Sequence, residues 1–387
     1  MSSPIDLYLA IDCGGTKTAA VLCSPSGNTL ARALTSGSNF AYLGLGAFLK
    51  GVGEATSSAL TAALKSPTPI TLPVDPTTHI DASGASTPHY NLRAAWLGVS
   101  GVDSPTVVSL LLPHVSALLS VPVERLMISN DTDLLAAPLR ILLGVRTAVA
   151  VVAGTGSIVA SFREGPADAP LEALARVGGW GWILGDEGGG FDVGRTAVRA
   201  LLAQQDAKTT GTIVANSPMR EKLLKKFGVT EVMDLLAAVH APDSTTSLPR
   251  ERRLSSLCPL VFEAAFDDED PLAVQVLGDC AHKLAIQISA VLLSPSAQEE
   301  HPRKVRAESS VLCLGGSLGG IYRYRELILS ALRENGHVFK HVEVVVDAAQ
   351  YGDPTIDIGD AGPNQQSRSQ DILRHAWTLQ RCKEPLL

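Results

Sequence analysis

Four glycine-rich turns stand where predicted strands end. They are Asp12–Thr18, Gly154–Ser157, Gly178–Gly181 and Gly315–Ser317. Glycine lets backbone N–H groups approach a phosphate closely, and Thr or Ser hydroxyls add further donors. One such turn is more often only a hairpin. Four in one chain, two of which contain a Gly-Thr pair, favour phosphate binding.

Two well-known phosphate motifs do not fit these turns. A P-loop needs glycine directly before its lysine and again five residues earlier, where this chain has Thr16 and Ile11 around Lys17. The Gly154 turn begins like a dinucleotide fingerprint, but Val159 takes the third glycine position and a strand follows in place of a helix. The sequence therefore supports neither a P-loop ATPase nor a Rossmann enzyme.

Three carboxylates lie beside predicted turns, and each has two interpretations. Asp12 ends the first predicted strand, where it caps a turn or holds a metal-bound water near phosphates. Asp131 precedes a helical segment, where it is a helix N-cap or a catalytic base. Asp186 lies in a glycine-rich run close to Trp180 and Trp182, which are core residues or a platform for a sugar ring.

The elements around these residues form a repeated pattern. Apolar runs at Leu7–Ile11, Thr18–Cys23 and Leu30–Leu34, separated by turn residues, predict an antiparallel three-strand meander. A similar beginning returns about 140 residues later at Ala148–Ala153 and Ile158–Phe162. The sequence therefore predicts a duplicated α/β fold.

Helical periodicity and breaker residues organise the rest of the chain. Helices are expected at Leu45–Leu64, at Pro105–Leu119 and over most of 192–294, with Pro271–Leu293 the longest. The stretch Ser66–Pro88 is rich in Pro, Thr and Ser, which predicts a flexible surface insertion. Further strands are expected at Ala94–Val99, Leu126–Ser129, Val311–Leu314 and His341–Val346.

Composition narrows the function classes. The 387 residues include 32 Lys and Arg against 39 Asp and Glu, a net charge of −7, and no basic stripe, so nucleic acid is not an expected partner. The longest apolar stretch is broken by prolines, and the start does not resemble a signal peptide, so we expect no membrane partner and a cytoplasmic protein. Six scattered cysteines are typical of reduced core residues.

Taken in order, these motifs resemble the N-acetylglucosamine/glucosamine kinases of the BadF/BadG-type ATPase family, within the sugar kinase/heat-shock-70/actin superfamily. The resemblance runs from about residue 7 to about residue 347 and rests most heavily on the run 178–188. It implies two RNase-H-like (actin-like ATPase) lobes around a central cleft, an N-terminal lobe over 1–130 and a C-terminal lobe over 131–387. The insertion at about 66–88 and the tail 351–387 depart from the family pattern. We also expect a homodimer.

The resemblance assigns roles residue by residue. Asp131 would be the base that faces the 6-hydroxyl of the sugar, and Asp12 would organise Mg²⁺ through water. The sugar would be bound by Asn39, Asp131, Ser157, Gly179, Trp180, Gly181 and Asp186. ATP would be bound by Gly14, Gly15, Thr16, Lys17, Gly154, Thr155, Gly156, Gly315 and Gly316.

The activity implied is the ATP-dependent phosphorylation of N-acetylglucosamine to N-acetylglucosamine 6-phosphate. Glucosamine or glucose remains an alternative substrate, because the sequence does not show whether the pocket admits an acetyl group. A partner-coupled ATPase regulator of the same superfamily is a second alternative. Such regulators commonly carry a cysteine-ligated iron–sulfur cluster, and the scattered cysteines disfavour that assignment.

Overall fold

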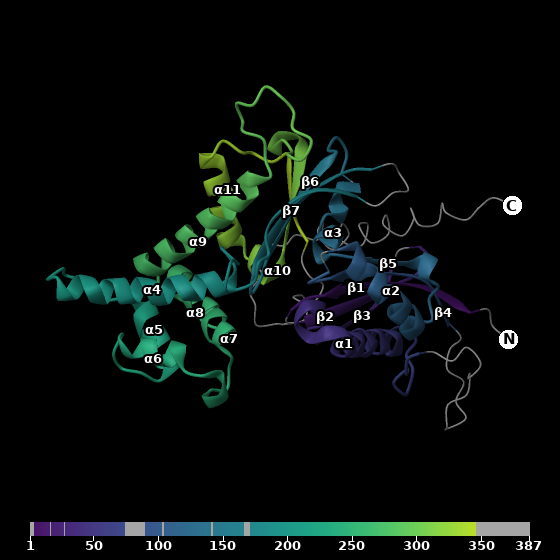
Figure 1. The fold of residues 1–387 in the computed structure, drawn as a ribbon, viewed down its shortest axis with the longest axis horizontal. Coiled ribbons are helices and arrows are strands. Elements are labelled where there is room, and N and C mark those ends of the chain that lie inside the picture. The colour runs from purple at the N-terminus through teal and green to yellow at the C-terminus, as the bar shows by residue number, and fades with distance from the viewer. Residues whose placement is uncertain are drawn as a thin grey trace. The chain divides into compact units, whose positions relative to one another are not determined.

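The computed structural model describes residues 4–15, 17–26, 28–73, 90–102, 104–140, 142–165 and 171–345 (Figure 1). Contacts divide the chain into two compact units, the first reaching Gly144 and the second comprising most of Val145–Val344. The first unit includes Asp131, the residue at which the sequence analysis begins its C-terminal lobe. Most of the expected insertion, and all of the tail 351–387, lie outside the described residues.

The first unit is built on a five-stranded sheet in the order β3-β2-β1-β4-β5. Its strands are β1 (Ile5–Cys13), β2 (Lys17–Cys23), β3 (Thr29–Ser36), β4 (Tyr90–Val99) and β5 (Leu126–Ser129). The strands β1, β2 and β3 pair antiparallel, as the meander predicted, whereas β1, β4 and β5 run parallel. Its helices are α1 (Phe40–Ala63), α2 (Pro105–Leu119) and α3 (Asp131–Leu135), with short 3-10 turns at Val123–Arg125 and Ala137–Arg140.

Local sequence signals explain where these helices begin. The side chain of Asn39 accepts a hydrogen bond from the Tyr42 N–H and caps α1. Ser104 caps α2 in the same way, with Pro105 in the first turn. The buried faces of both helices join the sheet in one apolar core that includes Leu9, Phe48, Leu60, Leu97 and Leu111.

The second unit repeats the sheet of the first. Its order is β10-β9-β6-β7-β8, which matches the first sheet strand for strand when read from β8. The strands are β6 (Thr147–Ala153), β7 (Ser157–Arg163), β8 (Glu172–Gly178), β9 (Ser310–Gly315) and β10 (His341–Val344). Here too the first two strands are antiparallel and the later ones parallel. The duplication expected from the sequence is confirmed.

Helices fill the second unit between β8 and β9 and after β9 (Figure 1). They are α4 (Gly190–Thr209), α5 (Pro218–Phe227), α6 (Asp234–His240), α7 (Arg250–Ser255), α8 (Cys258–Phe266), α9 (Pro271–Ala290), α10 (Gly316–Gly319) and α11 (Tyr322–Glu334), with 3-10 turns at Asp243–Thr245 and Ala307–Ser309. The long helix α9 buries one face, which includes Val276, Leu284 and Ile288, against α4, α8 and α11. This layer fixes the loops that precede α4.

Two expectations concern the interior and the membrane. The five cysteines in the described part of the chain are all buried and unpaired, as predicted for reduced core residues. Burial raises the pKa of the Cys13 thiol far above its ordinary value, so it does not ionise near neutral pH.

Among the helices that the structure describes, none combines the length and the apolar character that crossing a bilayer requires.

Candidate functional site

The parallel strands of the first unit bring three loops to one edge of the sheet. Asp12 on β1 pairs with Gly98 on β4, and Gly98 pairs with Ser129 on β5. Because parallel strands end at the same edge, residues that follow β1, β4 and β5 lie side by side there. Asp12 and the segment that contains Asp131 are therefore neighbours at this edge.

Hydrogen bonds tie the turn after β1 and the start of α1 to the same edge. Ser100 donates its N–H to Cys13 and accepts from the Phe40 N–H, at 3.0 and 3.2 Å. The Ser38 N–H donates to the Gly14 carbonyl, also at 3.0 Å. The amide nitrogen of Asn39 donates to the Ser100 hydroxyl at 3.1 Å. Asn39 is thus held, nearly buried, beside the loop that follows β4.

Asp131 opens α3, but it is not the residue that caps it. The Asn130 side chain accepts from the N–H of Thr132 at 3.1 Å and from its hydroxyl at 2.7 Å. A Cβ built on Gly98 would fall 3.3 Å from the Cα of Asp131, so glycine lets the backbone of β4 approach α3 closely. Of the two interpretations that the sequence left open for Asp131, the N-cap belongs to Asn130.

A second carboxylate on α3 received no role from the sequence. Burial raises the pKa of Asp133 to about 6, while hydrogen bonds from the Ser129 hydroxyl and the Asn130 N–H act in the opposite direction. The Trp96 indole N–H donates to the same Ser129 hydroxyl at 3.1 Å. The Asn-Asp-Thr-Asp pattern revealed two acids, but nothing in it revealed which one is desolvated.

In the second unit, the Gly154–Ser157 turn rests on the start of α4. The N–H groups of Gly190 and Phe191 donate to the carbonyls of Gly154 and Thr155, at 2.8 and 2.9 Å. A Cβ on Gly189 would lie 2.7 Å from the carbonyl carbon of Gly156, closer than real Cβ contacts come. Two glycine-rich segments that are separate in sequence therefore pack backbone to backbone.

Asp186 joins this turn through its side chain. One of its carboxylate oxygens accepts from the Ser157 N–H at 3.2 Å, and the Ser157 hydroxyl donates to the Glu187 carbonyl at 2.7 Å. Asp186 is 8% exposed and has a φ of +66°, a region that non-glycine residues rarely adopt. Burial raises its pKa, and the Ser157 N–H partly counteracts this.

The loop from Gly178 to Leu184 combines unusual backbone with exposed apolar side chains. Gly178, Gly179 and Gly181 all have φ between +68° and +79°. The Gly179 N–H donates to the Ser157 carbonyl at 3.0 Å, which joins the loop to the predicted site. Trp180 is 66% exposed, so it is not the core residue that one interpretation allowed, whereas Trp182 packs against the core through Phe191.

The turn after β9 lies against the end of β6. Gly316 has a φ of +82°, and a Cβ there would fall 2.4 Å from the Ala153 carbonyl oxygen. A Cβ on Gly154 would come no closer than 3.9 Å to Ser317. The predicted residues Gly154–Ser157 and Gly315–Gly316 therefore meet at the ends of adjacent parallel strands β6 and β9.

The predicted residues form one set in each unit. Those of the first unit are Asp12, Gly14, Gly15, Lys17, Asn39 and Asp131. Those of the second are Gly154, Thr155, Gly156, Ser157, Gly179, Trp180, Gly181, Asp186, Gly315 and Gly316. Thr16 lies outside the described residues. Within each unit, the residues described above lie around the ends of parallel strands.

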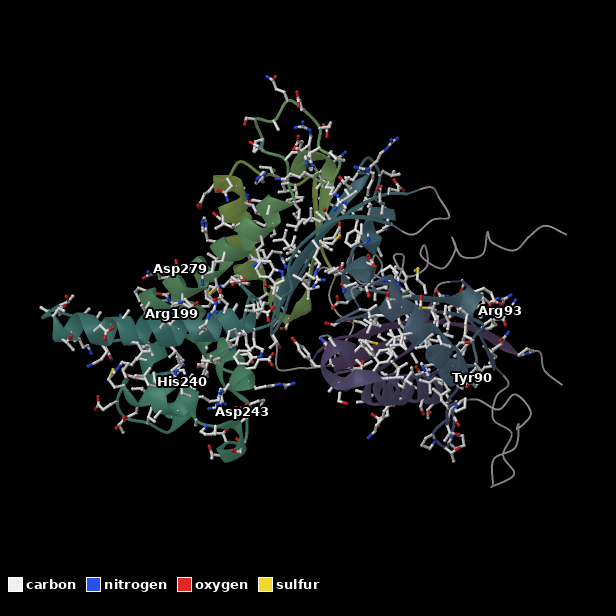
Figure 2. All side chains as sticks on the ribbon, in the orientation of Figure 1. Tyr90, Arg93, Arg199, His240, Asp243 and Asp279 are labelled. Carbon is white, nitrogen blue, oxygen red and sulfur yellow. The ribbon has the colours of Figure 1, made fainter. Side chains whose placement is uncertain are left out.

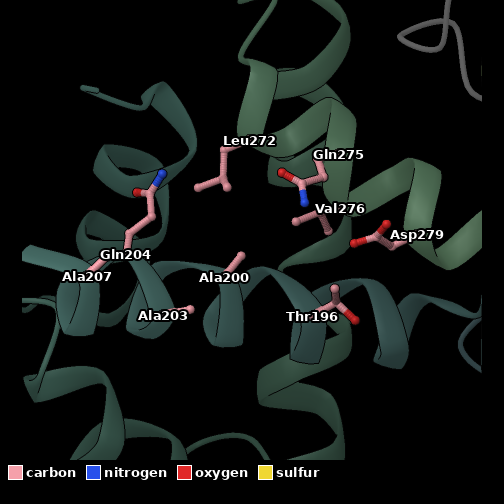
Figure 3. Close-up of a pocket in the computed structure, with 9 residues that line it drawn as sticks. All are labelled: Thr196, Ala200, Ala203, Gln204, Ala207, Leu272, Gln275, Val276 and Asp279. Atoms are coloured by element: carbon pink, nitrogen blue, oxygen red, sulfur yellow. The ribbon is translucent and has the colours of Figure 1, made fainter. Parts of the chain in front are cut away.

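A groove of about 350 Å³ lies elsewhere in the second unit, between α4 and α9 (Figure 3). Its lining consists of Thr196, Ala200, Ala203, Gln204, Ala207, Leu272, Gln275, Val276 and Asp279. None of the predicted site residues is among them. Charged side chains such as Arg199 on α4 and Asp279 on α9 (Figure 2) belong to these helices and not to the strand ends.

Two named proteins are similar to the chain in sequence. It is 27% identical over 300 residues to an N-acetyl-D-glucosamine kinase of Dictyostelium discoideum, covering 77% of this chain and 83% of the relative. It is 30% identical over 156 residues to an N-acetylmuramic acid/N-acetylglucosamine kinase of Clostridium acetobutylicum, covering 40% of this chain and 45% of that protein.

Solved structures share the fold. A provisionally named N-acetylglucosamine kinase of Porphyromonas gingivalis, 19% identical, gives a TM-score of 0.58 over 87% of this chain and 94% of its own. A similarly named Chromobacterium violaceum protein, 20% identical, gives 0.55 over 95% and 99%. The expected α/β fold of the sugar kinase and actin-like ATPases is confirmed. The sequence profile of the BadF/BadG/BcrA/BcrD ATPase family matches residues 9–350, and the chain therefore belongs to that family.

Proposed function

We propose that this protein is an ATP-dependent sugar kinase that phosphorylates the 6-hydroxyl of N-acetylglucosamine, giving N-acetylglucosamine 6-phosphate. The observation that carries the proposal is the position of Asp131, whose helix is capped by the neighbouring Asn130. Asp131 lies at the sheet edge that also holds Asp12 and Asn39. Membership of an ATPase family and the names of two relatives support the same assignment.

Asp131 would act as the general base, taking the proton from the attacking hydroxyl as the phosphoryl group arrives. Asn39 would orient the sugar, because only one of its two amide N–H groups is needed for the Ser100 hydroxyl. Asp186, whose carboxylate already accepts from the Ser157 N–H, would accept from sugar hydroxyls as well. Exposed Trp180 would cover an apolar face of the ring.

The turns fit a nucleotide by their shape. Gly15 is exposed, and a Cβ built there would meet no atom within 4 Å, so a phosphate could approach that backbone without hindrance. Gly154 is open in the same sense, with 3.9 Å to the nearest atom. Asp12 offers the hard oxygen donor that Mg²⁺ prefers, and would hold the ion through water. Bound MgATP would supply the phosphoryl group and neutralise part of its charge.

The decisive experiment compares two neighbouring acids on α3. Asp131→Asn should lower kcat for sugar phosphorylation by about 10²–10⁴-fold while leaving ATP binding and the thermal midpoint nearly unchanged, because it removes only the base. Asp133→Asn changes an acid two residues away and should retain activity. Each variant would be assayed by coupled ADP release, with phosphorus NMR of the product to identify the phosphorylated oxygen.

Substrate identity is tested on the unmodified protein with N-acetylglucosamine, glucosamine, glucose and N-acetylmuramic acid. The last sugar is included because the Clostridium acetobutylicum relative is named as a kinase of N-acetylmuramic acid and N-acetylglucosamine. We expect the highest kcat/KM with N-acetylglucosamine. Near wild-type turnover by Asp131→Asn would contradict the assignment of the base, and failure to phosphorylate any of the four sugars would contradict the kinase itself.

A further inference from the structure

Gly188 is held at both of its peptide groups by buried side chains. Its N–H donates to the carboxylate of Asp192 at 3.0 Å, and its carbonyl accepts from the Tyr324 hydroxyl at 2.8 Å. Both side chains are fully buried. A Cβ on Gly188 would fall 2.6 Å from the Cβ of Leu284, so the backbone also packs directly against α9. Three helices, α4, α9 and α11, therefore converge on one glycine.

Asp192 carries its charge inside the core because two cations offset it. The amine of Lys283 lies 3.1 Å from each carboxylate oxygen, and the Arg195 guanidinium lies 2.7 Å from one of them. Burial alone would raise the pKa of Asp192, but the Gly188 N–H, Arg195 and Lys283 together lower it below its ordinary value. The carboxylate is therefore ionised, and its bond to the Gly188 N–H is a charge-assisted one.

Asp192 holds the Glu187–Gly188 peptide, and Ser157 of the predicted site contacts the same peptide. The N–H of Gly188 and the carbonyl of Glu187 belong to one planar unit, so fixing one fixes the other. That carbonyl accepts from the Ser157 hydroxyl at 2.7 Å. The N–H of Ser157 in turn donates to Asp186 at 3.2 Å. A continuous chain of contacts thus runs from the buried carboxylate of Asp192 to that of Asp186.

We propose that Asp192 and Tyr324 are positioning residues, which hold the two peptide groups of Gly188 so that Ser157 and Asp186 keep the geometry needed to bind the sugar. Asp192 holds the Glu187–Gly188 peptide through its N–H, and Tyr324 holds the Gly188–Gly189 peptide through its carbonyl. This inference rests on the proposed function of the Asp186 site. Without this clamp of two bonds, the peptide groups on either side of Gly188 could rotate, and the Gly188 N–H and carbonyl would be left without partners in the core. Asp186 would lose its fixed relation to the 154–157 turn.

Two conservative variants test the clamp, each removing one interaction. Asp192→Asn keeps the volume but loses the charge, and Tyr324→Phe removes only the hydroxyl. Asp270→Asn is the matched control, since Asp270 is also a buried carboxylate of this unit and accepts from the N–H groups of Met219 and Leu272. All three variants should unfold at lower urea concentration than the wild type.

Only the first two variants should change recognition. We expect the KM for N-acetylglucosamine to rise about tenfold or more in Asp192→Asn and Tyr324→Phe, with a smaller change in the KM for ATP, because positional errors in a site weaken binding steeply. Asp270→Asn should leave both KM values unchanged. Equal KM values in all folded variants, or an equal rise in the control, would overturn the positioning role.

A second measurement does not depend on kinase activity. Hydrogen exchange of peptides covering 154–158 and 186–190, in the protein without substrate, should be faster in Asp192→Asn and Tyr324→Phe than in Asp270→Asn. Exchange in these two segments that matches the control would refute the clamp whether or not a sugar is phosphorylated. Faster exchange in a protein that phosphorylates none of the sugars would support the clamp and reject only the proposed function.

Discussion

Replacing Gly156 with alanine should displace the carboxylate of Asp186. A Cβ at this position would lie 2.7 Å from the Cγ and both carboxylate oxygens of Asp186. Van der Waals contact between such atoms begins at about 3.5 Å, so the two groups must separate by about 0.8 Å. The hydrogen bond from the Ser157 N–H to Asp186, now 3.2 Å, would then exceed the usual limit.

The expected loss of activity is that of one hydrogen bond between the sugar and Asp186. A hydrogen bond to a charged group contributes about 1.5–3 kcal/mol. If the displaced Asp186 no longer binds the sugar, kcat/KM for N-acetylglucosamine should fall roughly ten- to a hundredfold, since about 1.4 kcal/mol corresponds to a factor of ten. The loss should appear mainly in the KM for sugar. Steady-state kinetics with each substrate varied in turn would measure it.

A double-mutant cycle separates this contact from a general defect. In an Asp186→Ala background the new methyl group has room, so Gly156→Ala should have little further effect on kcat/KM. Gly278→Ala is the control, because Gly278 is in α9 and a Cβ there would meet nothing within 4 Å. Wild-type kcat/KM in Gly156→Ala, or the same loss in both backgrounds, would refute the reasoning.

Two further predictions concern the first unit. Burial raises the pKa of Asp133 from 3.8 to about 6 in the folded protein. The protonated acid therefore contributes stability at low pH, and this contribution is lost as the pH rises through 6. The unfolding free energy of Asp133→Asn relative to wild type should therefore increase by about 2 kcal/mol between pH 4.5 and pH 7.5. Urea unfolding at both values measures this gain, and a pH-independent difference would count against the buried, protonated acid. Gly101→Ala places a Cβ at a φ of +87° and 2.6 Å from the Cβ of Ala41, so it should cost about 1–3 kcal/mol and raise the KM for sugar by moving Asn39. Unchanged unfolding and an unchanged KM would show that the loop after β4 adjusts freely.

Much of the fold was readable because its signals are local. The meander over β1, β2 and β3 follows from short apolar runs between turn residues, and its repetition at β6 and β7 predicted the duplicated fold. The helix expected over Pro105–Leu119 is α2, and in the structure Ser104 caps it, with Pro105 in its first turn. These features depend on neighbours a few residues away, which the sequence displays directly.

The sequence could propose residue types for the candidate site, but it could not predict the contacts between them. The sequence offered Asp131 as a base or a cap, and the observed bond from the Thr132 N–H to Asn130 assigns the cap to Asn130. It gave no sign of Lys283 as the partner of Asp192, because 91 positions separate them and only the packing of α9 on α4 brings them together. Burial likewise decides which acid of α3 has a raised pKa, and burial is a property of the folded chain.

The glycines of the predicted turns illustrate the same limit in physical terms. In the sequence they all indicate a backbone that a phosphate could approach. In the structure, Gly156 and Gly316 are required because a Cβ would collide with the protein itself at 2.4–2.7 Å. Gly15 and Gly154 meet no such obstacle, and alone among these four leave space for a ligand beside their Cα atoms. Close packing between turns and access to a nucleotide therefore select the same residue for different reasons, and only the surroundings of the missing Cβ distinguish them.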